Sequence, residues 1–189
     1  MSRSNVPAVS RTSTAAYIAS GGSIRPLRRT NDRVRGCPTP YPRTVALRVS
    51  AYAVIIGERG MLLSRLSPLV GVGPLWTLPG GGIDPFEDPV DAAVREVREE
   101  TGYDVAIDNL VGVSSLVIDP ALEPTNLAEK TQMLRIVYRA HVVGGALTHE
   151  VDGSTDLAGW IALAELDDLP RVELVDVART LAGLTPPST

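Results

Sequence analysis

The stretch "GGGIDPFEDPVDAAVREVREETGY", residues 80–103, places a glycine cluster directly in front of a strongly predicted helix. Asp88 is a suitable N-cap, Pro89 favours the first helical position, and Gly102 follows the expected end at Thr101. Small or apolar side chains recur at helical spacing, which predicts a buried stripe formed by Val90, Ala93, Val94, Val97 and Thr101. We therefore predict a helix from Pro89 to Thr101.

That helix crowds three carboxylates beside its apolar stripe. Glu96, Glu99 and Glu100 are three and four residues apart, where like charges cost about 0.2–0.5 kcal/mol per pair. One interpretation is a solvated acidic face balanced by Arg95 and Arg98. The other is a divalent-cation site, because carboxylate oxygens are hard ligands. The glycine cluster favours the second interpretation, since close-approaching backbone supplies carbonyls for a metal and N–H groups for phosphate.

The overall composition fits one domain with an appendage. The chain has 189 residues, of which 44% are hydrophobic and 4% aromatic, so the core is expected to be mainly aliphatic. The formal net charge of -4 is unevenly spread, because residues 1–45 carry eight Arg and one acid. The remaining residues are acidic, which argues against binding to a nucleic-acid polymer.

The first 44 residues are rich in Ser, Thr, Arg, Pro and Gly and are expected to be a disordered or loosely attached tail. An organellar transit peptide and a true start further downstream are the alternatives. Cys37 is the single cysteine, so no disulfide forms within the chain. No apolar run reaches the roughly 20 residues of a membrane helix. These features predict a cytoplasmic protein without a membrane segment.

Ordered structure is expected over residues 45–184, with 185–189 as a C-terminal tail. Apolar and β-branched runs predict strands, and a final amphipathic run predicts a helix; these segments are 45–56, 61–66, 112–118 and 133–143 for the strands and 172–184 for the helix. A short strand leading into a helical turn is expected in "LAGWIALAELDDL". Strands and helices intermix without regular alternation, which favours an α+β or α/β sandwich around a mixed sheet.

The spacing of the quoted stretch resembles the Nudix box. Gly81, five residues, Glu87, seven residues and then "REVREETGY" (95–103) fill that signature over 23 residues. The flanking segments "WTLPGGG" and "GWIALAELDDL" are also similar to the family, and the likeness spans residues 45–184. The resemblance implies an α/β/α sandwich. It also implies hydrolysis of a phosphoanhydride in a nucleoside diphosphate linked to another moiety, with Mg²⁺ or Mn²⁺.

The resemblance also implies roles for individual residues. Glu99 and Glu100 would be the principal metal ligands, and Glu96 a further ligand or the group that activates water. The backbone carbonyl of Gly80 or Gly81 would complete part of the metal shell. Arg95 would hold the carboxylates in place, and Glu87 would act structurally or as an outer metal ligand.

Substrate contacts are expected from the glycine cluster, including Gly80 and Gly82, and from Phe86 and Tyr52 as candidates for contact with a base. Phe86 stands where family members often carry Gly, so the loop is expected to differ locally. Tyr103 replaces the usual bulky aliphatic residue at a packing position. Trp76, Tyr138 and Trp160 are better explained as core residues.

A general base in some relatives lies in a loop after the box. Glu150, Asp152 and Asp156 are the candidates here, and an ordinary acidic turn is the alternative explanation. Pro120 is an ordinary loop proline or a mark of ADP-ribose specificity. A nucleotide-like small molecule is the expected partner, a homodimer is left open, and a nucleotide-sensing module that does not cut its ligand is the competing function.

Overall fold

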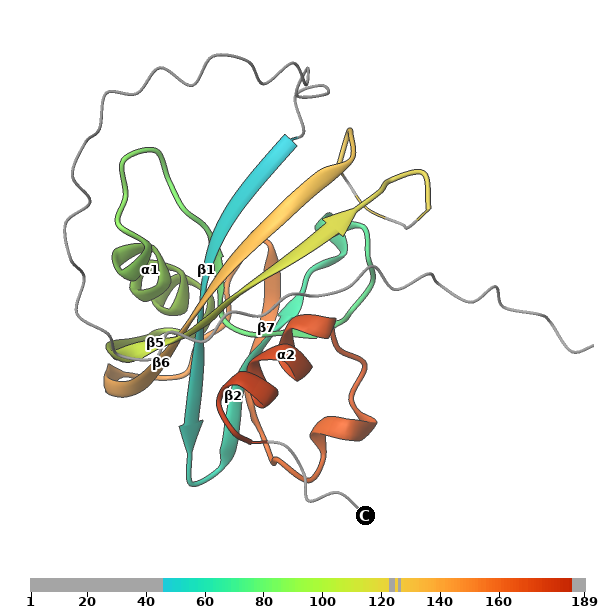
Figure 1. Ribbon diagram of the computed structural model, residues 1–189. Helices are drawn as coiled ribbons and strands as arrows, with labels where there is room; N and C mark the ends of the chain where they lie inside the picture. The colour runs from blue at the N-terminus through green and yellow to red at the C-terminus, as the bar shows by residue number, and fades with distance from the viewer. Residues whose placement is uncertain (1–45, 123–124, 126, 185–189) are drawn as a thin grey trace, which may run out of the picture.

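The computed structural model describes residues 46–122, 125 and 127–184. The predicted N-terminal and C-terminal tails therefore lie outside the described residues. The described residues form β-strands, two α-helices and two short 3-10 helices (Figure 1); in chain order they are β1 (Ala46–Gly57), β2 (Gly60–Leu66), η1 (Pro68–Val70), β3 (Trp76–Thr77), β4 (Gly80–Gly82), α1 (Pro89–Thr101), β5 (Tyr103–Ile118), β6 (Thr131–Gly145), β7 (Thr155–Ile161), η2 (Leu166–Asp168) and α2 (Glu173–Leu181).

The central strand β1 organises a mixed sheet. Strands run in the order β3-β2-β1-β6-β5, while β4 also pairs with β1 and β7 with β2. The β1–β6 pair is parallel and the other pairs are antiparallel. One edge of β1 serves two partners, since Ser50–Tyr52 pairs with β4 and Ile56–Gly57 with β2. The mixed sheet confirms the predicted fold class.

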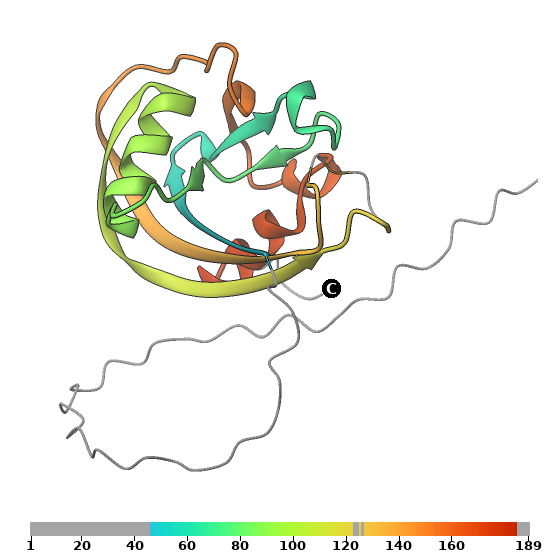
Figure 2. The same cartoon turned by 90° about the horizontal axis from the view of Figure 1, so that it is seen from above.

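The two helices cover opposite faces of this sheet, because successive residues of β1 point to alternate sides. Val54 packs in a cluster with Val137 of β6 and Val175 of α2. The neighbouring Ala53 belongs to a second cluster that includes Val97 of α1. Figure 2 shows β5 and β6 curving as a long paired ribbon around the rest of the domain.

Helix α1 has the predicted bounds. The Asp88 side chain accepts a hydrogen bond from Val90 N at 2.8 Å, Pro89 lies at the first turn, and Gly102 ends the helix at φ +73°. The predicted stripe was partly wrong: Ala93, Val97 and Thr101 are buried, but Val90 is exposed. Ala92 and Glu100 are buried as well, because α1 packs against β1, β4 and β5 rather than along one narrow seam.

Two other predictions are corrected. The glycine cluster is not a loop, because Gly80–Gly82 pairs with Ser50–Tyr52 as strand β4. The predicted strand 112–118 is the second half of β5, which begins at Tyr103. A register shift between Ile107 and Asn109 interrupts the regular pairing of β5 with β6. It does not end the strand, since the two strands remain paired beyond it.

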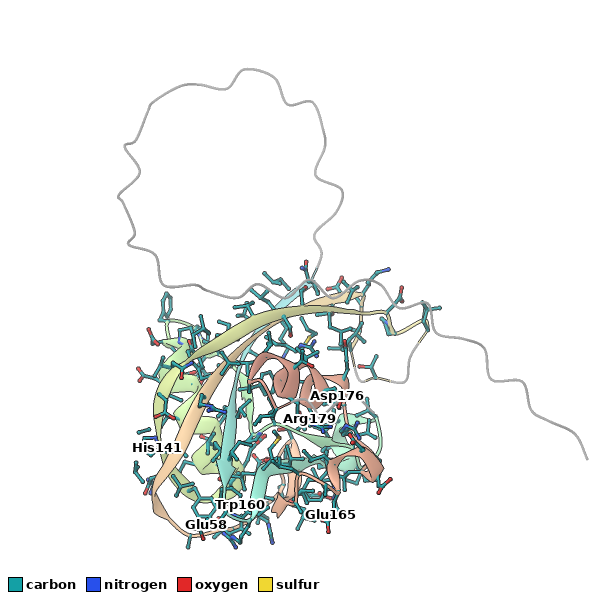
Figure 3. All side chains as sticks on the ribbon, turned by 60° about the horizontal axis from the view of Figure 1, so that its bottom comes forward. Glu58, His141, Trp160, Glu165, Asp176 and Arg179 are labelled. Atoms are coloured by element: carbon teal, nitrogen blue, oxygen red, sulfur yellow. The ribbon has the colours of Figure 1, made fainter. Side chains whose placement is uncertain are left out.

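Helix α2 is held by ion pairs as well as by apolar contacts. The Arg179 side chain is 8% exposed, and its Nη1 lies 2.6 Å from Asp167 Oδ1 and 3.6 Å from Asp176 Oδ1. Figure 3 shows Arg179 and Asp176 side by side. The Asp167 contact attaches the helix to η2, whereas the Asp176 contact lies within α2. Within the described residues, no helix is both long and apolar enough to span a membrane.

Replacing Gly102 with Ala should destabilise the fold more than replacing Gly73 with Ala. Both glycines have positive φ, which costs a non-glycine residue about 1–3 kcal/mol. A Cβ at Gly102 would also lie 2.4 Å from the carbonyl oxygen of Ala146, whereas nothing lies within 4 Å of one at Gly73. Urea unfolding measures both free energies, and equal losses would contradict the close approach at Gly102.

Candidate active site

Arg95, in the middle of α1, makes the most contacts in the side-chain network between this helix, the preceding turn and β4. Its Nε and Nη2 donate to the two carboxylate oxygens of Glu87, at 2.8 and 2.9 Å. Its Nη1 donates to Glu96 at 2.9 Å and to Glu99 at 3.2 Å. Nη2 also reaches the carbonyl oxygen of Gly82 in β4, at 3.1 Å. One guanidinium thus connects the helix, the preceding turn and the glycine strand.

Glu87 faces Arg95 and the turn rather than the other carboxylates. Its Oε2 also accepts a hydrogen bond from Asp84 N at 2.9 Å. The Arg95 guanidinium, followed by this backbone donor, lowers the pKa of Glu87 to about 2. The arrangement suits a bracing role for Glu87, one of the two roles implied by the sequence.

Glu100 is the most buried acid of the site. It is 1% exposed, and its Oε2 accepts a hydrogen bond from Gly80 N at 3.1 Å. Burial raises the pKa of Glu100 well above its usual value, and the charges of Glu96 and Glu150 raise it further. The hydrogen bond from Gly80 opposes this shift. The local structure therefore holds a carboxyl group whose charged form is strongly disfavoured by the loss of water around it.

Glu96 lies against the second glycine of β4. A Cβ on Gly81 would stand 2.6 Å from Glu96 Oε2, so only glycine permits this approach. Burial raises the pKa of Glu96, Arg95 lowers it, and the charges of Glu99 and Glu150 raise it. Glu99 is more open, with half of its side chain exposed. The three box carboxylates thus range from fully buried to half exposed.

The donor set fits a hard divalent cation. Glu96, Glu99 and Glu100 offer carboxylate oxygens beside the backbone of β4, and the mutual repulsion of the acids is what a cation would relieve. Among the residues that the structure describes, no three acid, histidine or cysteine side chains already surround one point as a finished metal site. Instead, the Nη1 atom of Arg95 lies between Glu96 and Glu99.

The loop between β6 and β7 brings Glu150 to this cluster. Thr148 N donates to the carbonyl oxygen of Thr101, which fixes the loop to the end of α1. Glu150 Oε2 accepts hydrogen bonds from Thr155 N at 2.9 Å and from Thr155 Oγ1 at 2.8 Å. Its charge raises the pKa of both Glu96 and Glu100, so the three carboxylates share one electrostatic environment.

The other two base candidates are placed differently. Asp156 receives two hydrogen bonds from Arg65, at 2.8 and 3.1 Å, and this contact lowers its pKa. Asp152 is exposed and has a positive φ of 61°. Of the three candidates, Glu150 is therefore the one whose charge acts on the carboxylates of Glu96 and Glu100.

The predicted substrate-contact residues occupy two environments. Tyr52 is opposite Gly80 in the β1–β4 pair, and burial raises the pKa of its phenol. A Cβ on Gly80 would lie 2.9 Å from the Tyr52 ring, so these two residues are in close contact. Phe86 is fully exposed at φ +72°, the local difference expected where relatives carry Gly.

Some residues had roles that the sequence did not reveal. The Tyr103 hydroxyl accepts hydrogen bonds from Arg59 at 3.1 Å and from Trp160 at 3.2 Å, so it links the start of β5 to the β1–β2 turn and to β7. His141 is exposed at the surface (Figure 3), and its Nδ1 lies 2.7 Å from Asp108 Oδ1. Arg135 is buried in the sheet, and a single Arg inside a strand pattern gives no signal for this.

Known proteins share both the sequence pattern and the fold. The family model described as NUDIX domain matches residues 46–180. A Bacillus subtilis (strain 168) protein named "Putative 8-oxo-dGTP diphosphatase" is 58% identical over 63 residues, which are 33% of this chain and 40% of that protein. An RNA pyrophosphohydrolase of Bartonella clarridgeiae is 45% identical over 65 residues, which are 33% of this chain and 36% of that protein. The chain thus matches less than half the length of these curated relatives.

Solved structures extend the likeness over most of the domain. A MutT NUDIX hydrolase from Burkholderia pseudomallei is 30% identical with a TM-score of 0.55, covering 74% of this chain and 98% of that one. A NUDIX hydrolase from Nitrosomonas europaea is 26% identical with a TM-score of 0.58, covering 74% and 92%. The family-model match, these structures and the geometry of the box agree: the chain belongs to the Nudix family.

Proposed function

We propose that the protein hydrolyses a phosphoanhydride bond in a nucleoside diphosphate linked to another moiety. The observation that carries this proposal is the convergence of Glu96 and Glu100 on the glycine strand β4, with Arg95 bracing the cluster. Buried acids with raised pKa values beside close-approaching backbone are typical of a catalytic site rather than a solvated acidic surface. The names of the relatives, which include a diphosphatase and a pyrophosphohydrolase, support the same reaction class.

The acids would hold Mg²⁺ or Mn²⁺. Glu96, Glu99 and Glu100, with the backbone carbonyl at Gly81 or Gly80, are the proposed ligands. A bound divalent ion screens phosphate charge and lowers the pKa of a coordinated water. Arg95 would hold Glu96 and Glu99 in position, so that their oxygens need little reorganisation when the ion binds.

Glu150 is the proposed general base. Thr155 fixes its carboxylate through Oε2, and the Glu150 charge acts on the neighbouring acids Glu96 and Glu100, so the carboxylate stands within electrostatic reach of the proposed metal ligands. Glu96 is the alternative base implied by the sequence. Both lie at the same cluster, whereas the Asp156 carboxylate is already held by Arg65.

The proposed partner is a nucleotide-like small molecule in the cytoplasm. A screen of nucleoside triphosphates, ADP-ribose, dinucleoside polyphosphates and NADH with Mg²⁺ or Mn²⁺ tests the function. Release of a mononucleotide or pyrophosphate product would support it. Tight binding without turnover of any compound would favour the nucleotide-sensing alternative. Sedimentation velocity would test the homodimer, which stays a prediction.

Glu99→Gln and Glu100→Gln should each lower kcat/KM by about 100-fold or more, because loss of a metal ligand forfeits several kcal/mol of transition-state stabilisation. Steady-state hydrolysis of the best substrate at saturating Mg²⁺ measures this. Glu165→Gln is the matched control, because Glu165 is an exposed acid near η2. A near-normal rate in Glu99→Gln or in Glu100→Gln would refute the assignment of the replaced glutamate as a metal ligand.

Divalent metal should raise the melting temperature of the wild-type protein. A ligand present at 100 times its Kd stabilises the folded state by about 2.7 kcal/mol. Glu100→Gln should shrink this gain and should itself raise stability without metal, because it removes a buried, repelled charge. Differential scanning fluorimetry with Mg²⁺ and EDTA measures both effects. Equal metal-induced gains in the two proteins would show that Glu100 does not bind the ion.

Metal-free protein should become more stable as the pH falls from about 8 to about 5. The folded state raises the pKa of Glu96 and Glu100 and so binds protons more tightly than the unfolded chain does. The two glutamates therefore destabilise the fold increasingly as the pH rises from their pKa values in the unfolded chain through their higher pKa values in the folded protein. Glu87 acts oppositely, but its pKa near 2 places its effect below this range. Thermal unfolding in EDTA measures the slope, and an unchanged slope in Glu100→Gln would contradict the assignment.

A further inference from the structure

Arg135 is a buried cation that the proposed catalytic cluster does not use. It lies on β6, is 5% exposed, and its Nε donates to Ser114 Oγ of β5 at 3.0 Å. Its Nη2 atom is buried and has no hydrogen-bond partner among the described residues. The nearest carboxylate oxygen, Glu173 Oε2, lies 3.9 Å from Nη2, beyond hydrogen-bond length. A buried guanidinium that lacks a hydrogen-bonded anion is costly to the fold.

The strand register aligns Arg135 of β6 with Gly82 of the glycine strand β4, because both pair with Ser50 of β1. Gly82 of β4, Ser50 of β1, Arg135 of β6 and Ser114 of β5 are successive cross-strand partners. Residues directly opposite one another in a sheet share a face. Arg135 therefore stands two strands away from β4, or roughly 10 Å at the usual strand spacing.

A second guanidinium and a buried phenol lie near the glycine strand on this side of the sheet. The Arg48 guanidinium lies 3.6 Å from the position of a Cβ on Gly82, at the edge of this face. Arg48 and Arg135 both lower the pKa of the Tyr52 phenol, and Glu100 raises it, although burial has the largest effect. The phenol thus lies within electrostatic reach of both the box acid and the two guanidinium groups.

Glu173 at the start of α2 stands on the solvent side of Arg135. Its side chain is 46% exposed, against 6% for Arg135. Strands β1, β5 and β6 continue past α2 (Figure 1), so the helix covers only part of this face. An anion that binds Arg135 would compete with the Glu173 carboxylate, which forms a long ion pair with Nη2 at 3.9 Å.

We propose that Arg135 recognises a second phosphate of the substrate, carried on a sugar beyond the anhydride that is cut. This inference rests on the proposed hydrolase function. A guanidinium has only donors and binds phosphate oxygens with paired, charge-assisted hydrogen bonds. The reacting anhydride would sit where the box acids meet the backbone of β4, and the sugar would extend from there across β1, the strand between β4 and β6, toward Arg135. The substrate class is therefore a sugar-phosphorylated nucleotide rather than a plain nucleoside triphosphate.

Binding of a matched ligand pair tests this without catalysis. The pair is adenosine 3′,5′-bisphosphate and adenosine 5′-monophosphate, which differ by one sugar phosphate. Isothermal titration calorimetry of the whole chain with Mg²⁺ should show that the bisphosphate binds roughly tenfold more tightly or better. Equal affinities, or no binding of either compound, would overturn the proposal.

Variants separate recognition from a structural role. Arg135→Met should abolish the preference for the bisphosphate and keep or raise the melting temperature, because it removes a poorly paired buried charge. Glu173→Gln should strengthen the preference, because it removes a competing negative charge. Lys130→Gln is the control for net charge, since Lys130 is exposed and pairs with Asp119. A destabilised Arg135→Met with an unchanged preference would show that Arg135 is only structural.

Hydrolysis assays distinguish this proposal from the one on which it rests. Coenzyme A and dephospho-coenzyme A, and NADPH and NADH, are pairs that differ by one sugar phosphate. Faster hydrolysis of the phosphorylated members, through a lower KM with similar kcat, would support the proposal. Hydrolysis without that preference would overturn the role of Arg135 but leave the hydrolase function standing. Preferential binding without any hydrolysis would overturn the hydrolase function alone.

Discussion

The site depends on keeping Glu100 buried and close to other acids. A single backbone donor, Gly80 N, meets its carboxylate, while Glu96 and Glu150 add negative charge. Such an arrangement is unfavourable in the protein alone, since desolvation and repulsion act in the same direction. In the proposed function, a bound cation would offset both costs. The surrounding structure is therefore best understood as the means of holding this unfavourable arrangement in place.

Two features of the fold perform that task. β1 divides one of its edges between β2 and β4, which places three consecutive glycines beside the carboxyl-terminal half of α1. Absence of a side chain at Gly81 lets the Glu96 carboxylate touch the strand. Arg95 then joins Glu87, Glu96 and the Gly82 carbonyl, so that one side chain links the turn, the helix and the strand. Preorganisation of this kind lowers the cost of rearranging charges during a reaction.

The sequence predicted those parts that depend on local chemistry. The caps Asp88 and Gly102 were sufficient to place both ends of α1, and the spacing of the glutamates identified the acidic cluster. It could not predict that the glycines pair as β4, because a three-residue strand has no periodicity and exists only through its partner β1. Nor could it separate Glu150 from Asp152, because the difference arises from the path of one loop. Arg135 carries no local pattern at all, and its burial follows from long-range pairing of β1, β6 and β5.

The most direct measurement of the central claim is the pKa of Glu100 with and without divalent metal, from carbon-13 NMR of the side-chain carboxyl carbon. Glu100→Gln identifies the resonance, and Glu165 provides an exposed reference in the same spectra. In the metal-free protein the Glu100 pKa should lie well above the usual value for a glutamate, and Mg²⁺ should bring it below that value. A Glu100 pKa at the usual value without metal, or one that does not respond to Mg²⁺, would contradict the account.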